Sequence, residues 1–366
     1  MIKTMFVIGT RPEAIKMAPI IMQCKKYSRL ISPIIVAVSQ HDALLSQALE
    51  IFNIVPDHNL HVMEKEQTLF SINIKILQRI EPILDKITPH LVLVQGDTTT
   101  VFACALAAYY KRIDIGHVEA GLRSFDKYNP FPEEINRRLT DALSDIHFAP
   151  TETAKKNLMK EGIDKNNIFI TGNPVIDALY LILKRKWVDN LKQINWKKRI
   201  ILVTVHRRES FGKGLLHIAN ALKTLANNNS DIEILFPVHP NPKVSFMKKK
   251  LREIENIKLF EPFDYITFVN IMKRSSLILT DSGGVQEEAP SLGIPVLVLR
   301  EVTERPEAVR AGCVRVVGVQ TKKIVVETER LLHNKVYYDK MAKSINPYGD
   351  GKASERIIKA ILRKYR

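Results

Sequence analysis

The sequence predicts an α/β protein built from two doubly wound parallel β-sheets, each covered by helices on both faces. The chain has 366 residues, which is enough for about two domains of roughly 150 residues each. Short runs of Ile, Val and Leu alternate with stretches of helical periodicity along the whole chain. Parallel strands that are buried on both faces produce such continuous apolar runs, and each connection between them needs a helix.

The apolar runs form two series. In the first series, the expected strands are Lys3–Ile8, Pro33–Val38, Leu91–Gln95, Ile113–Val118, Ile146–Ala149 and Ile168–Thr171. In the second series, they are Ile200–Thr204, Glu233–Val238, Ile257–Phe260, Leu277–Thr280, Pro295–Leu299 and Val314–Val316. The clearest helical patterns are Pro12–Tyr27, Leu69–Lys86 and Tyr265–Arg274. Because strands alternate with helices in each series, each predicts one doubly wound domain.

A polar, basic segment, LKRKWVDNLKQINWKKR, separates the two series. We therefore place the boundary between Thr171 and Lys198, and expect an N-terminal domain over residues 1–172 and a C-terminal domain over residues 173–351. The final stretch, GKASERIIKAILRKYR, has the spacing of an amphipathic helix. Its apolar side consists of Ile357, Ile358, Ile361 and Leu362.

The net charge is +16, from 55 Lys and Arg against 39 Asp and Glu. A basic chain can bind nucleic acid. Here the basic residues are scattered, apart from small clusters at Lys248–Lys250 and Lys184–Arg199, and no zinc-finger spacing or RNP-like run accompanies them. A generally basic proteome or an anionic small substrate is the alternative explanation of the charge, and we expect no nucleic-acid partner.

The cysteines Cys24, Cys104 and Cys313 are odd in number and far apart, so they predict neither a disulfide framework nor a CxxC zinc site. The N-terminal sequence MIKTMFVIGTRPE lacks the features of a signal peptide, and no apolar run approaches the ~18 residues of a membrane span. We therefore expect a cytoplasmic protein with no membrane partner. No Walker A, GxSxG or HExxH motif is present, and His58 and His61 lack ligand-type neighbours, so we expect no metal.

Polar turns at the C-terminal ends of the strands are candidate sites, because ligands of open parallel sheets bind there. In the turn Gly9–Lys16, Arg11 and Lys16 accompany a helix N-terminus and predict an anion site; a plain turn with a solvated Arg11 is the alternative. The turn lacks GxGxxG, which argues against a nicotinamide cofactor. Asp97 lies in the turn Gly96–Thr100, where it serves either in chemistry or only as a helix cap.

Two further carboxylates could converge with Asp97. Glu119 lies in GHVEAGLR, and Glu133 lies in PFPEEINRR. Converging carboxylates are what acid/base chemistry on a sugar requires. The residues that follow fit ion pairs on a helix surface instead: Glu134, Arg137 and Arg138.

In the second series, His206 follows a strand end and is flanked by Arg207 and Arg208. This grouping suggests contact with a phosphate. A structural histidine is an equally good interpretation.

A small-residue turn, Ser282-Gly283-Gly284, opens a helix after another strand of the second series. Small residues there let a phosphate approach the free backbone N–H groups. Glu288 lies further along the same helix, where it could reach a ribose, and Arg305 follows the next strand end.

Taken together, these motifs resemble one family. In order along the chain, the following segments resemble the non-hydrolysing UDP-N-acetylglucosamine 2-epimerases: GTRPEAIKMAP, GDTTT, GHVEAGLRS, PFPEEINRRLTDALSD, HFAPTE, HRRESFG, PVHPNP, TDSGGVQEEAPSLGIPVLVLR, TERPEAV and NPYGDG. The resemblance implies the two-domain glycosyltransferase B fold, with the active site in the interdomain cleft and the C-terminal helix 352–366 on the first domain. It implies interconversion of UDP-N-acetylglucosamine and UDP-N-acetylmannosamine for surface polysaccharides, by a homodimer without a cofactor.

The motifs also discriminate within the superfamily. Relatives that act on diacetamido-uronic acid sugars, or that hydrolyse the substrate, tend to read RPQxIK and MPEEINR. This chain reads RPEAIK and PFPEEINR and so resembles the plain epimerases. The alternatives are a UDP-sugar glycosyltransferase of the same fold and an epimerase for a related UDP-2-acetamido sugar.

The chemistry of such a reaction explains the residues. C2 of the sugar is next to no carbonyl, so its proton is hardly acidic, and the fingerprint for oxidation by NAD is missing. The remaining route eliminates UDP to give a glycal, and UDP adds back after protonation on the other face. This route requires a diphosphate clamp and carboxylates near the sugar.

The resemblance assigns a role to each candidate residue. Catalysis is assigned to Asp97, Glu119, Glu133 and His206, of which the histidine faces the diphosphate. Contacts with the substrate are assigned to Arg11, Lys16, Ser282, Gly283, Gly284, Glu288 and Arg305.

Many bacterial members of the family bind a second UDP-N-acetylglucosamine, which activates the enzyme. The resemblance places these residues around that pocket: Gln40, His41, Gln67, Glu133, Arg207 and His239. Family members usually carry Arg where this chain has Glu66. A carboxylate there would repel the activator's diphosphate instead of pairing with it, so we expect weak or absent activation.

Overall fold

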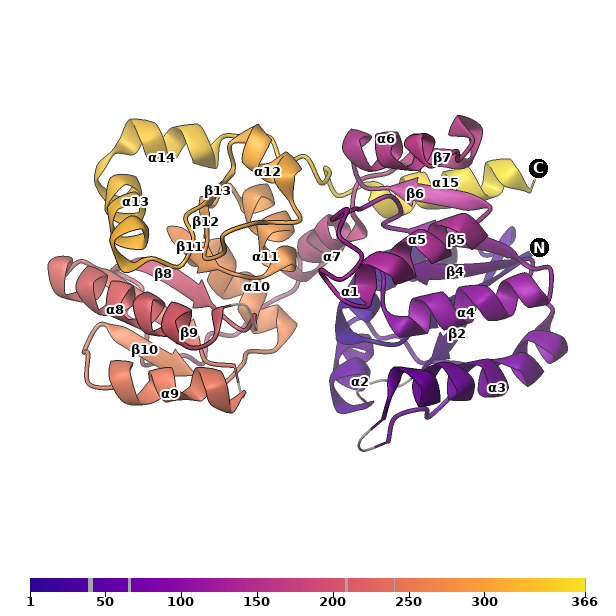
Figure 1. The fold of residues 1–366 in the computed structure, drawn as a ribbon, viewed down its shortest axis with the longest axis horizontal. Coiled ribbons are helices and arrows are strands. Elements are labelled where there is room, and N and C mark those ends of the chain that lie inside the picture. The colour runs from indigo at the N-terminus through magenta and orange to yellow at the C-terminus, as the bar shows by residue number, and fades with distance from the viewer. Residues whose placement is uncertain (39–41, 65–66, 208–209, 240, 366) are drawn as a thin grey trace. The chain divides into compact units, whose positions relative to one another are not determined.

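The computed structural model describes residues 1–38, 42–64, 67–207, 210–239 and 241–365. The chain divides into two compact units (Figure 1). The first unit comprises Met1–Leu181 and Tyr348–Arg366, and the second comprises Ile182–Pro347.

Over its described residues, the first unit is a seven-stranded parallel sheet with helices on both faces. Its strands are β1 (Ile2–Ile8), β2 (Ile31–Ala37), β3 (His58–Asn59), β4 (Leu91–Gln95), β5 (Asp114–Val118), β6 (Ile146–Ala149) and β7 (Ile168–Ile170). Its helices are α1 (Arg11–Cys24), α2 (Asp42–Ile51), α3 (Leu69–Ile87), α4 (Thr99–Tyr110), α5 (Glu133–Leu143), α6 (Glu152–Lys160), α7 (Pro174–Leu183) and α15 (Ala353–Lys364). Two short 3-10 helices, η1 (Lys25–Tyr27) and η2 (Lys165–Asn167), complete the described elements.

The strand order of this sheet is β3-β2-β1-β4-β5-β6-β7, and the described neighbours pair in parallel. From β1 the chain adds strands on one side, then crosses over and adds the rest on the other side. The predicted doubly wound sheet is therefore confirmed. The winding reverses between β1 and β4, which is where open α/β sheets bind ligands.

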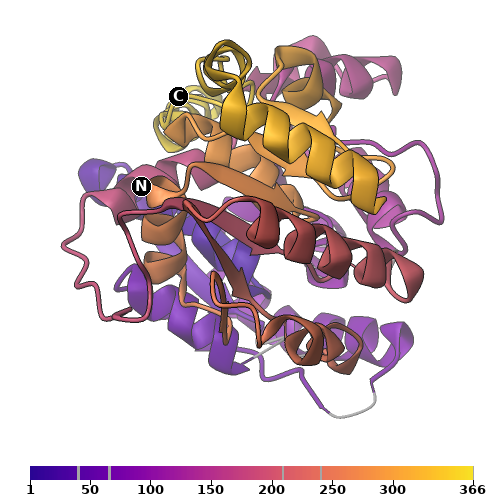
Figure 2. The same ribbon diagram turned by 90° about the vertical axis from the view of Figure 1, so that its left-hand side faces the viewer.

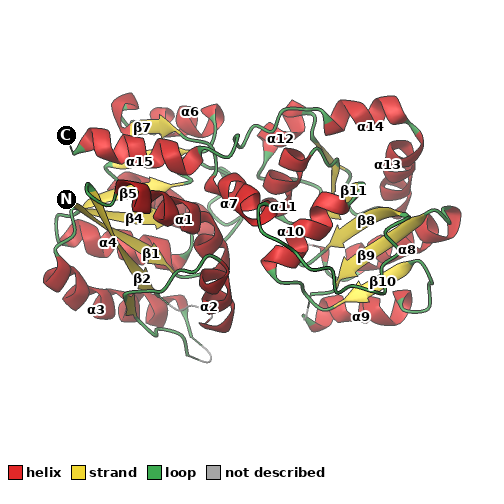
Figure 3. Ribbon diagram, turned by 180° about the vertical axis from the view of Figure 1, so that it is seen from behind, coloured by secondary structure: helices red, strands yellow, loops and turns green. Residues whose placement is uncertain are grey.

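Helices cover both faces of the first sheet. Figure 1 shows α3 and α4 in front of it, and α5 packs beside α4. Figure 3 shows α1 and α15 together on the opposite face. The side chains of Met5, Val7, Val92 and Val94 point toward the α3–α4 layer and form a buried cluster with helix residues such as Ile76.

Over its described residues, the second unit is a six-stranded parallel sheet in the order β10-β9-β8-β11-β12-β13. Its strands are β8 (Arg199–Thr204), β9 (Ile232–Pro237), β10 (Ile257–Phe260), β11 (Leu277–Thr280), β12 (Val296–Val298) and β13 (Val314–Val316). Its helices are α8 (Lys213–Asn228), α9 (Pro242–Leu251), α10 (Tyr265–Arg274), α11 (Gly283–Glu288), η4 (Ala289–Leu292), α12 (Pro306–Ala311), α13 (Thr321–His333) and α14 (Lys335–Ala342). The winding reverses between β8 and β11, so the second doubly wound sheet is also confirmed.

The helices of the second unit again form two layers. Helices α13, α8 and α9 lie in a row on one face of the sheet (Figures 1 and 2), and α10 lies on the other face (Figure 3). The core between the first layer and the sheet contains Val203, Leu215, Leu222, Ile234 and Leu279, all fully buried.

Threonine caps fix where two helices of the first unit begin. Thr10, just after β1, accepts a hydrogen bond from the backbone N–H of Glu13 at 3.4 Å. Thr98, just after β4, accepts one from the backbone N–H of Val101 at 3.3 Å. Such caps satisfy the N–H groups at a helix start, and here they place two helix N-termini at the C-terminal edge of the sheet.

Most strand predictions agree with the structure to within one or two residues at each end. The predicted helix Tyr265–Arg274 matches α10 at both ends. The strand β3 (His58–Asn59) was not predicted, because two residues are too few to show an apolar pattern.

The first unit runs to Leu181 rather than ending at residue 172, and it resumes at Tyr348 rather than at residue 352. Most of α7 belongs to the first unit, and its residues Val175, Ile176 and Leu179 are buried. The carboxylate of Asp177 in α7 also accepts hydrogen bonds from the backbone N–H groups of Ala353 and Ser354, at 3.0 and 2.9 Å.

The C-terminal helix α15 packs on α1. Its predicted apolar residues are all buried: Ile357, Ile358, Ile361 and Leu362. The predicted amphipathic helix and its inward side are therefore confirmed.

Candidate active site

Candidate residues of the first unit follow the strands β1, β4 and β5, whose C-terminal ends meet at one edge of the sheet. Arg11 begins α1 and is half-buried, and Lys16 lies further along the same helix. Asp97 follows β4, and Glu119 follows β5. Glu133 begins α5, which packs beside α4.

Glu119 is held by donors from three other segments. Its carboxylate accepts from the ammonium of Lys16 at 2.9 and 2.7 Å and from the side-chain amide of Asn173 at 3.1 Å. The side-chain amide of Gln95 donates to it as well. Its backbone φ of +70° lies in the left-handed region, which is costly for a residue other than glycine. The carboxylate of Glu119 is therefore buried and held in a fixed position. Its partners Asn173 and Gln95 were not predicted from the sequence.

Asp97 is held by two residues of α5. The side-chain amide of Asn136 donates to the carbonyl of Asp97 at 3.0 Å, and the guanidinium of Arg137 donates to its carboxylate. Arg137 also lies 3.3 Å from Glu134, and both side chains are buried. The prediction of helix-surface ion pairs is therefore wrong for Glu134 and Arg137, because they face inward.

The outer member of that predicted group, Arg138, does lie on the surface, 3.5 Å from Glu161. Glu133 is half-buried, and among the described residues no hydrogen-bond partner reaches its Oε2 atom.

Glu13 is a buried carboxyl at this edge that the sequence analysis did not single out. Its Oε2 accepts from the backbone N–H of Gly9 at 2.6 Å, and its Oε1 accepts from the hydroxyl of Thr98 at 2.9 Å. Burial raises the pKa of Glu13 to about 7, although these hydrogen bonds act in the opposite direction. Glu13 therefore ties the turn after β1 to the turn after β4.

In the second unit, His206 follows β8 and is held by Asp281, which follows β11. The imidazole Nδ1 lies 3.0 Å from Oδ1 of Asp281, and the backbone N–H groups of His206 and Arg207 donate to Oδ2 at 2.9 and 2.8 Å. The ring of His206 stacks on that of His239, with the two ring centroids 5.9 Å apart. Burial and the neighbouring His206 lower the pKa of His239. Asp281 is fully buried, and it is a further partner that sequence reasoning missed.

Two guanidinium groups converge on the start of α11. A Cβ atom added at Gly283 would lie 3.6 Å from Nη2 of Arg305 and 3.8 Å from Nη2 of Arg207. The carboxylate of Glu287 accepts from Arg305. Glu304 lies 3.9 Å from Arg207. This arrangement presents two cations and the backbone of a glycine turn at one place, as a diphosphate requires.

Carboxylates balance these cations. Burial alone would raise the pKa of Glu304, but Arg300, Arg305 and Arg207 lower it to about 2. On α11 itself, Glu288 is buried, and its Oε2 accepts from the hydroxyl of Tyr265 at 2.7 Å. Tyr265 therefore fixes the orientation of the carboxylate that sequence reasoning assigned to a ribose.

Of the residues assigned to an activator, Gln40 and His41 lie outside the described residues, as does Glu66. Gln67 belongs to the first unit, and its side-chain amide donates to the carbonyl of Val62. Glu133 also belongs to the first unit, whereas Arg207 and His239 belong to the second unit.

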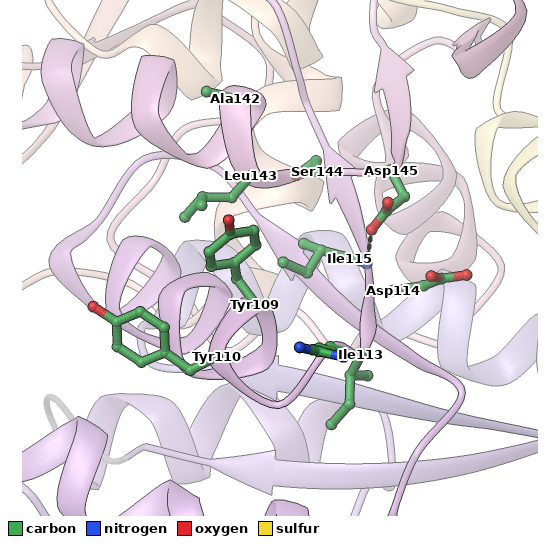
Figure 4. Close-up of a pocket in the computed structure, with 10 residues that line it drawn as sticks. Tyr109, Tyr110, Ile113, Asp114, Ile115, Ala142, Leu143, Ser144 and Asp145 are labelled. Carbon is green, nitrogen blue, oxygen red and sulfur yellow. Dashed lines mark hydrogen bonds between the residues drawn. The ribbon is translucent and has the colours of Figure 1, made fainter.

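A hollow of about 590 Å³ lies at the opposite edge of the first sheet, where β5 and β6 begin (Figure 4). It is lined by Tyr109, Tyr110, Arg112, Ile113, Asp114, Ile115, Ala142, Leu143, Ser144 and Asp145. None of the candidate residues is among them, so this hollow is separate from the candidate site.

None of the described helices has the length and apolar composition of a transmembrane segment. Among the described residues, no group of three or more His, Cys, Asp and Glu side chains could hold a metal ion.

Comparison with models of protein families shows to which family the chain belongs. The model for UDP-N-acetylglucosamine 2-epimerase matches residues 23–362. The chain belongs to the UDP-N-acetylglucosamine 2-epimerase family. The family predicted from the motifs is therefore confirmed.

Individual relatives cover the chain from end to end. The UDP-N-acetylglucosamine 2-epimerase of Salmonella typhimurium (strain LT2) is 50% identical to this member of the family, over 100% of this chain and 99% of that protein. The crystal structure of the Neisseria meningitidis UDP-GlcNAc 2-epimerase bound to UDP-GlcNAc has a TM-score of 0.93 and 44% identity, over 99% of this chain and 100% of that one. The Staphylococcus aureus MnaA–UDP co-structure has a TM-score of 0.92 and 44% identity, over 100% of this chain and 97% of that one.

Proposed function

We propose that this chain interconverts UDP-N-acetylglucosamine and UDP-N-acetylmannosamine by elimination and re-addition of UDP, and so supplies surface polysaccharide synthesis. The observation that carries the proposal is the end-to-end similarity to enzymes named for this activity, at 50% identity for one of them. A solved relative is bound to UDP-GlcNAc. The local geometry of both units fits the demands of the reaction.

In the forward direction, the bond between C1 and the diphosphate oxygen breaks, and UDP leaves with the electron pair. A carboxylate takes the proton from C2, and the C1–C2 double bond of 2-acetamidoglucal forms. A proton then arrives at C2 from the opposite face, and the diphosphate oxygen re-forms its bond to C1. Atoms and charge balance without a cofactor, because the proton removed and the proton added are equivalent.

The first unit would supply the groups that move the proton and stabilise charge. We assign these roles to Asp97, Glu119 and Glu133, with Arg11 and Lys16 near the sugar and diphosphate. The buried contacts of Glu119 and the guanidinium on Asp97 support this assignment, because they hold the two carboxylates in fixed positions.

The second unit would bind UDP. We assign the diphosphate to Ser282, Gly283, Gly284, Arg305 and His206. The convergence of two guanidinium groups beside Gly283 supports this role. The ribose is assigned to Glu288, whose carboxylate is already oriented by Tyr265.

Isotope exchange tests the proposal. The protein is incubated with UDP-N-acetylglucosamine in heavy water without any sugar acceptor, and the recovered UDP-sugars are analysed by NMR. We expect deuterium at C2 of both epimers, and exchange at least about 10²-fold slower with an Asp97→Asn control. Absence of deuterium after long incubation of the unaltered protein would overturn the proposal.

The same experiment separates the alternatives. A UDP-sugar glycosyltransferase needs an acceptor and leaves the C2–H bond intact. An epimerase for a related UDP-2-acetamido sugar would exchange C2–H of that sugar at a higher kcat/KM than that of UDP-N-acetylglucosamine. Nucleic-acid binding makes another distinct prediction, namely tight, salt-sensitive binding to random duplex, and we expect none at physiological salt.

We further propose that the protein is a cytoplasmic homodimer. The cysteines Cys24, Cys104 and Cys313 are unpaired, which suits a reducing compartment. Large apolar side chains are exposed on the neighbouring helices α3, α4 and α5: Phe70, Ile74, Tyr110 and Leu139. We take these exposed apolar side chains as the candidate interface. Light scattering should give twice the chain mass of 41.8 kDa, and a monomeric mass would contradict the dimer.

A further inference from the structure

A buried histidine lies behind the carboxylates of the first unit and has no part in the roles assigned above. His117 in β5 is fully buried. Its Nδ1 lies 2.6 Å from Oδ1 of Asp141 in α5, and its Nε2 lies 2.8 Å from the carbonyl oxygen of Gly96. Both ring nitrogens therefore contact oxygen atoms at hydrogen-bond distance.

The partners of His117 determine its protonation state. A backbone carbonyl can only accept, so Nε2 must carry a hydrogen. Asp141 is also an acceptor, because its second oxygen accepts from Arg123 at 2.7 Å and from the backbone N–H of Gly121 at 3.2 Å. Burial would raise the pKa of Asp141, but His117, Arg123 and His147 lower it. Both nitrogens of His117 then carry hydrogens, and the ring is a buried imidazolium paired with a carboxylate.

This pair contacts each segment that carries a proposed catalytic carboxylate. Gly96 immediately precedes Asp97, and its φ of +85° lies in the left-handed region that favours glycine. Gly121 follows Glu119 in the turn after β5, and Asp141 itself lies in α5, which Glu133 begins. One buried ion pair thus fastens together the turns after β4 and β5 and the helix α5.

We propose that His117 and Asp141 are positioning residues for the epimerase reaction, and that His117 is the imidazolium of a buried ion pair. The imidazolium holds the carbonyl of Gly96 and so fixes Asp97. The carboxylate of Asp141 holds the turn after Glu119. Proton transfer is sensitive to small displacements of its acid and base. The proposal rests on the proposed function for its role in catalysis, but the state of the ion pair does not depend on any activity.

Nitrogen NMR of the unaltered protein tests that state directly. Histidine is labelled with ¹⁵N in both ring positions, and the signals of His117 are identified by their loss in His117→Phe. We expect both ring nitrogens of His117 to carry slowly exchanging protons at neutral pH. A nitrogen of His117 without a proton at neutral pH would overturn the imidazolium, whether or not the protein is an epimerase.

Two variants test the positioning role. His117→Phe keeps the volume of the ring and removes both hydrogen bonds, and we expect kcat to fall about 10²-fold, the size of effect produced by misplacing reacting groups by about 1 Å. KM and the affinity for UDP should change less than about twofold, because one lost positioning contact affects the transition state alone. Near-normal kcat, or a loss of UDP binding equal to the loss of kcat, would overturn the role.

Asp141→Asn is the matched control, because it preserves the hydrogen bonds in neutral form. The amide of the new Asn can donate to Nδ1 of a neutral His117, whose Nε2–H still reaches Gly96. We expect kcat within about tenfold of the unaltered protein, the cost of one weakened hydrogen bond, together with a loss of the Nδ1 proton signal. A loss as large as that of His117→Phe would show that hydrogen bonding does not fix the carboxylates. If the unaltered protein shows no C2 exchange, the proposed function fails, while the NMR result stands.

Discussion

The ammonium of Lys16 lies 2.9 and 2.7 Å from the two carboxylate oxygens of Glu119. Both side chains are largely buried, with 12% and 5% of their surfaces exposed. A cation assigned to the substrate is therefore already paired with a carboxylate assigned to catalysis. Buried pairs are costly to break, because the remaining charge has lost its hydration.

Lys16→Met should lower the free energy of unfolding by about 3 kcal/mol, as the loss of one partner of a buried ion pair does. The double variant Lys16→Met/Glu119→Gln should lose less than the sum of the two single variants, because it leaves no unpaired carboxylate. Urea titrations of the four proteins measure this coupling. Strict additivity would show that the two groups are energetically independent.

Glu13→Gln should make the stability less dependent on pH. The folded state raises the pKa of Glu13 from 4.5 to about 7, so the neutral form is favoured. The stabilisation by Glu13 is therefore complete below pH 4.5 and is lost as the pH rises through about 7. Glutamine is neutral throughout and can still accept from Gly9 and donate to the oxygen of Thr98.

Relative to the unaltered protein, the free energy of unfolding of Glu13→Gln should rise by about 1.4 kcal/mol per pH unit across this window, to a total of about 3 kcal/mol. Urea titrations between pH 4.5 and pH 8 check it. Parallel stability profiles for the two proteins would contradict the assignment of Glu13 as a neutral buried carboxyl.

Neutralising any of the three proposed catalytic carboxylates should reduce turnover by about 10²-fold or more, because each substitution removes a proton-transfer or charge-stabilising group. The variants are Asp97→Asn, Glu119→Gln and Glu133→Gln, and their affinity for UDP should survive. His206→Ala should slow both elimination and re-addition. Accumulated glycal and free UDP in a quenched reaction would demonstrate the intermediate, and near-normal rates in all three carboxylate variants would refute the assignment.

Tyr265→Phe should weaken UDP binding and leave kcat unchanged. The variant removes the hydroxyl that donates to Glu288 at 2.7 Å, and we expect the Kd for UDP to rise about fivefold, which corresponds to one hydrogen bond. Calorimetry measures the change. A UDP analogue that lacks both ribose hydroxyls is the control: it should bind the variant and the unaltered protein equally, and an equal loss with this analogue would exclude the ribose contact.

We predict that activation by UDP-N-acetylglucosamine is weak or absent, because Glu66 stands where the family resemblance implies an Arg. An assay that starts from UDP-N-acetylmannosamine alone should show an immediate linear rate. Glu66→Arg should introduce a lag that traces of UDP-N-acetylglucosamine abolish. The same lag in the unaltered protein would show that the activator site works despite Glu66.

Local patterns were enough to predict the described strands other than β3, the winding of both sheets and the apolar side of α15. Each depends on residues close in sequence, such as the run Leu91–Gln95 or the spacing of Ile357 and Ile361. The turns at the strand ends were predictable for the same reason.

The partners of the candidate residues were not predictable from one sequence. Arg137 donates to Asp97 across 40 positions of the chain, and its spacing relative to Glu134 is equally typical of a surface ion pair. The burial of Glu13 depends on how Gly9 and Thr98 come together in space. The turn chemistry indicated anion binding, whereas the positioning of Glu119 by Lys16 and Asn173 is visible only in three dimensions.

The first unit is discontinuous, because residues 182–347 form the second unit before the chain returns with α15. During synthesis, the surface of α1 that α15 covers stays exposed until the whole second unit has emerged from the ribosome. The second unit is continuous and can fold as soon as it emerges. We therefore expect the order of folding in the cell to run against the order of the sequence, with the unit that begins the chain being the last to close.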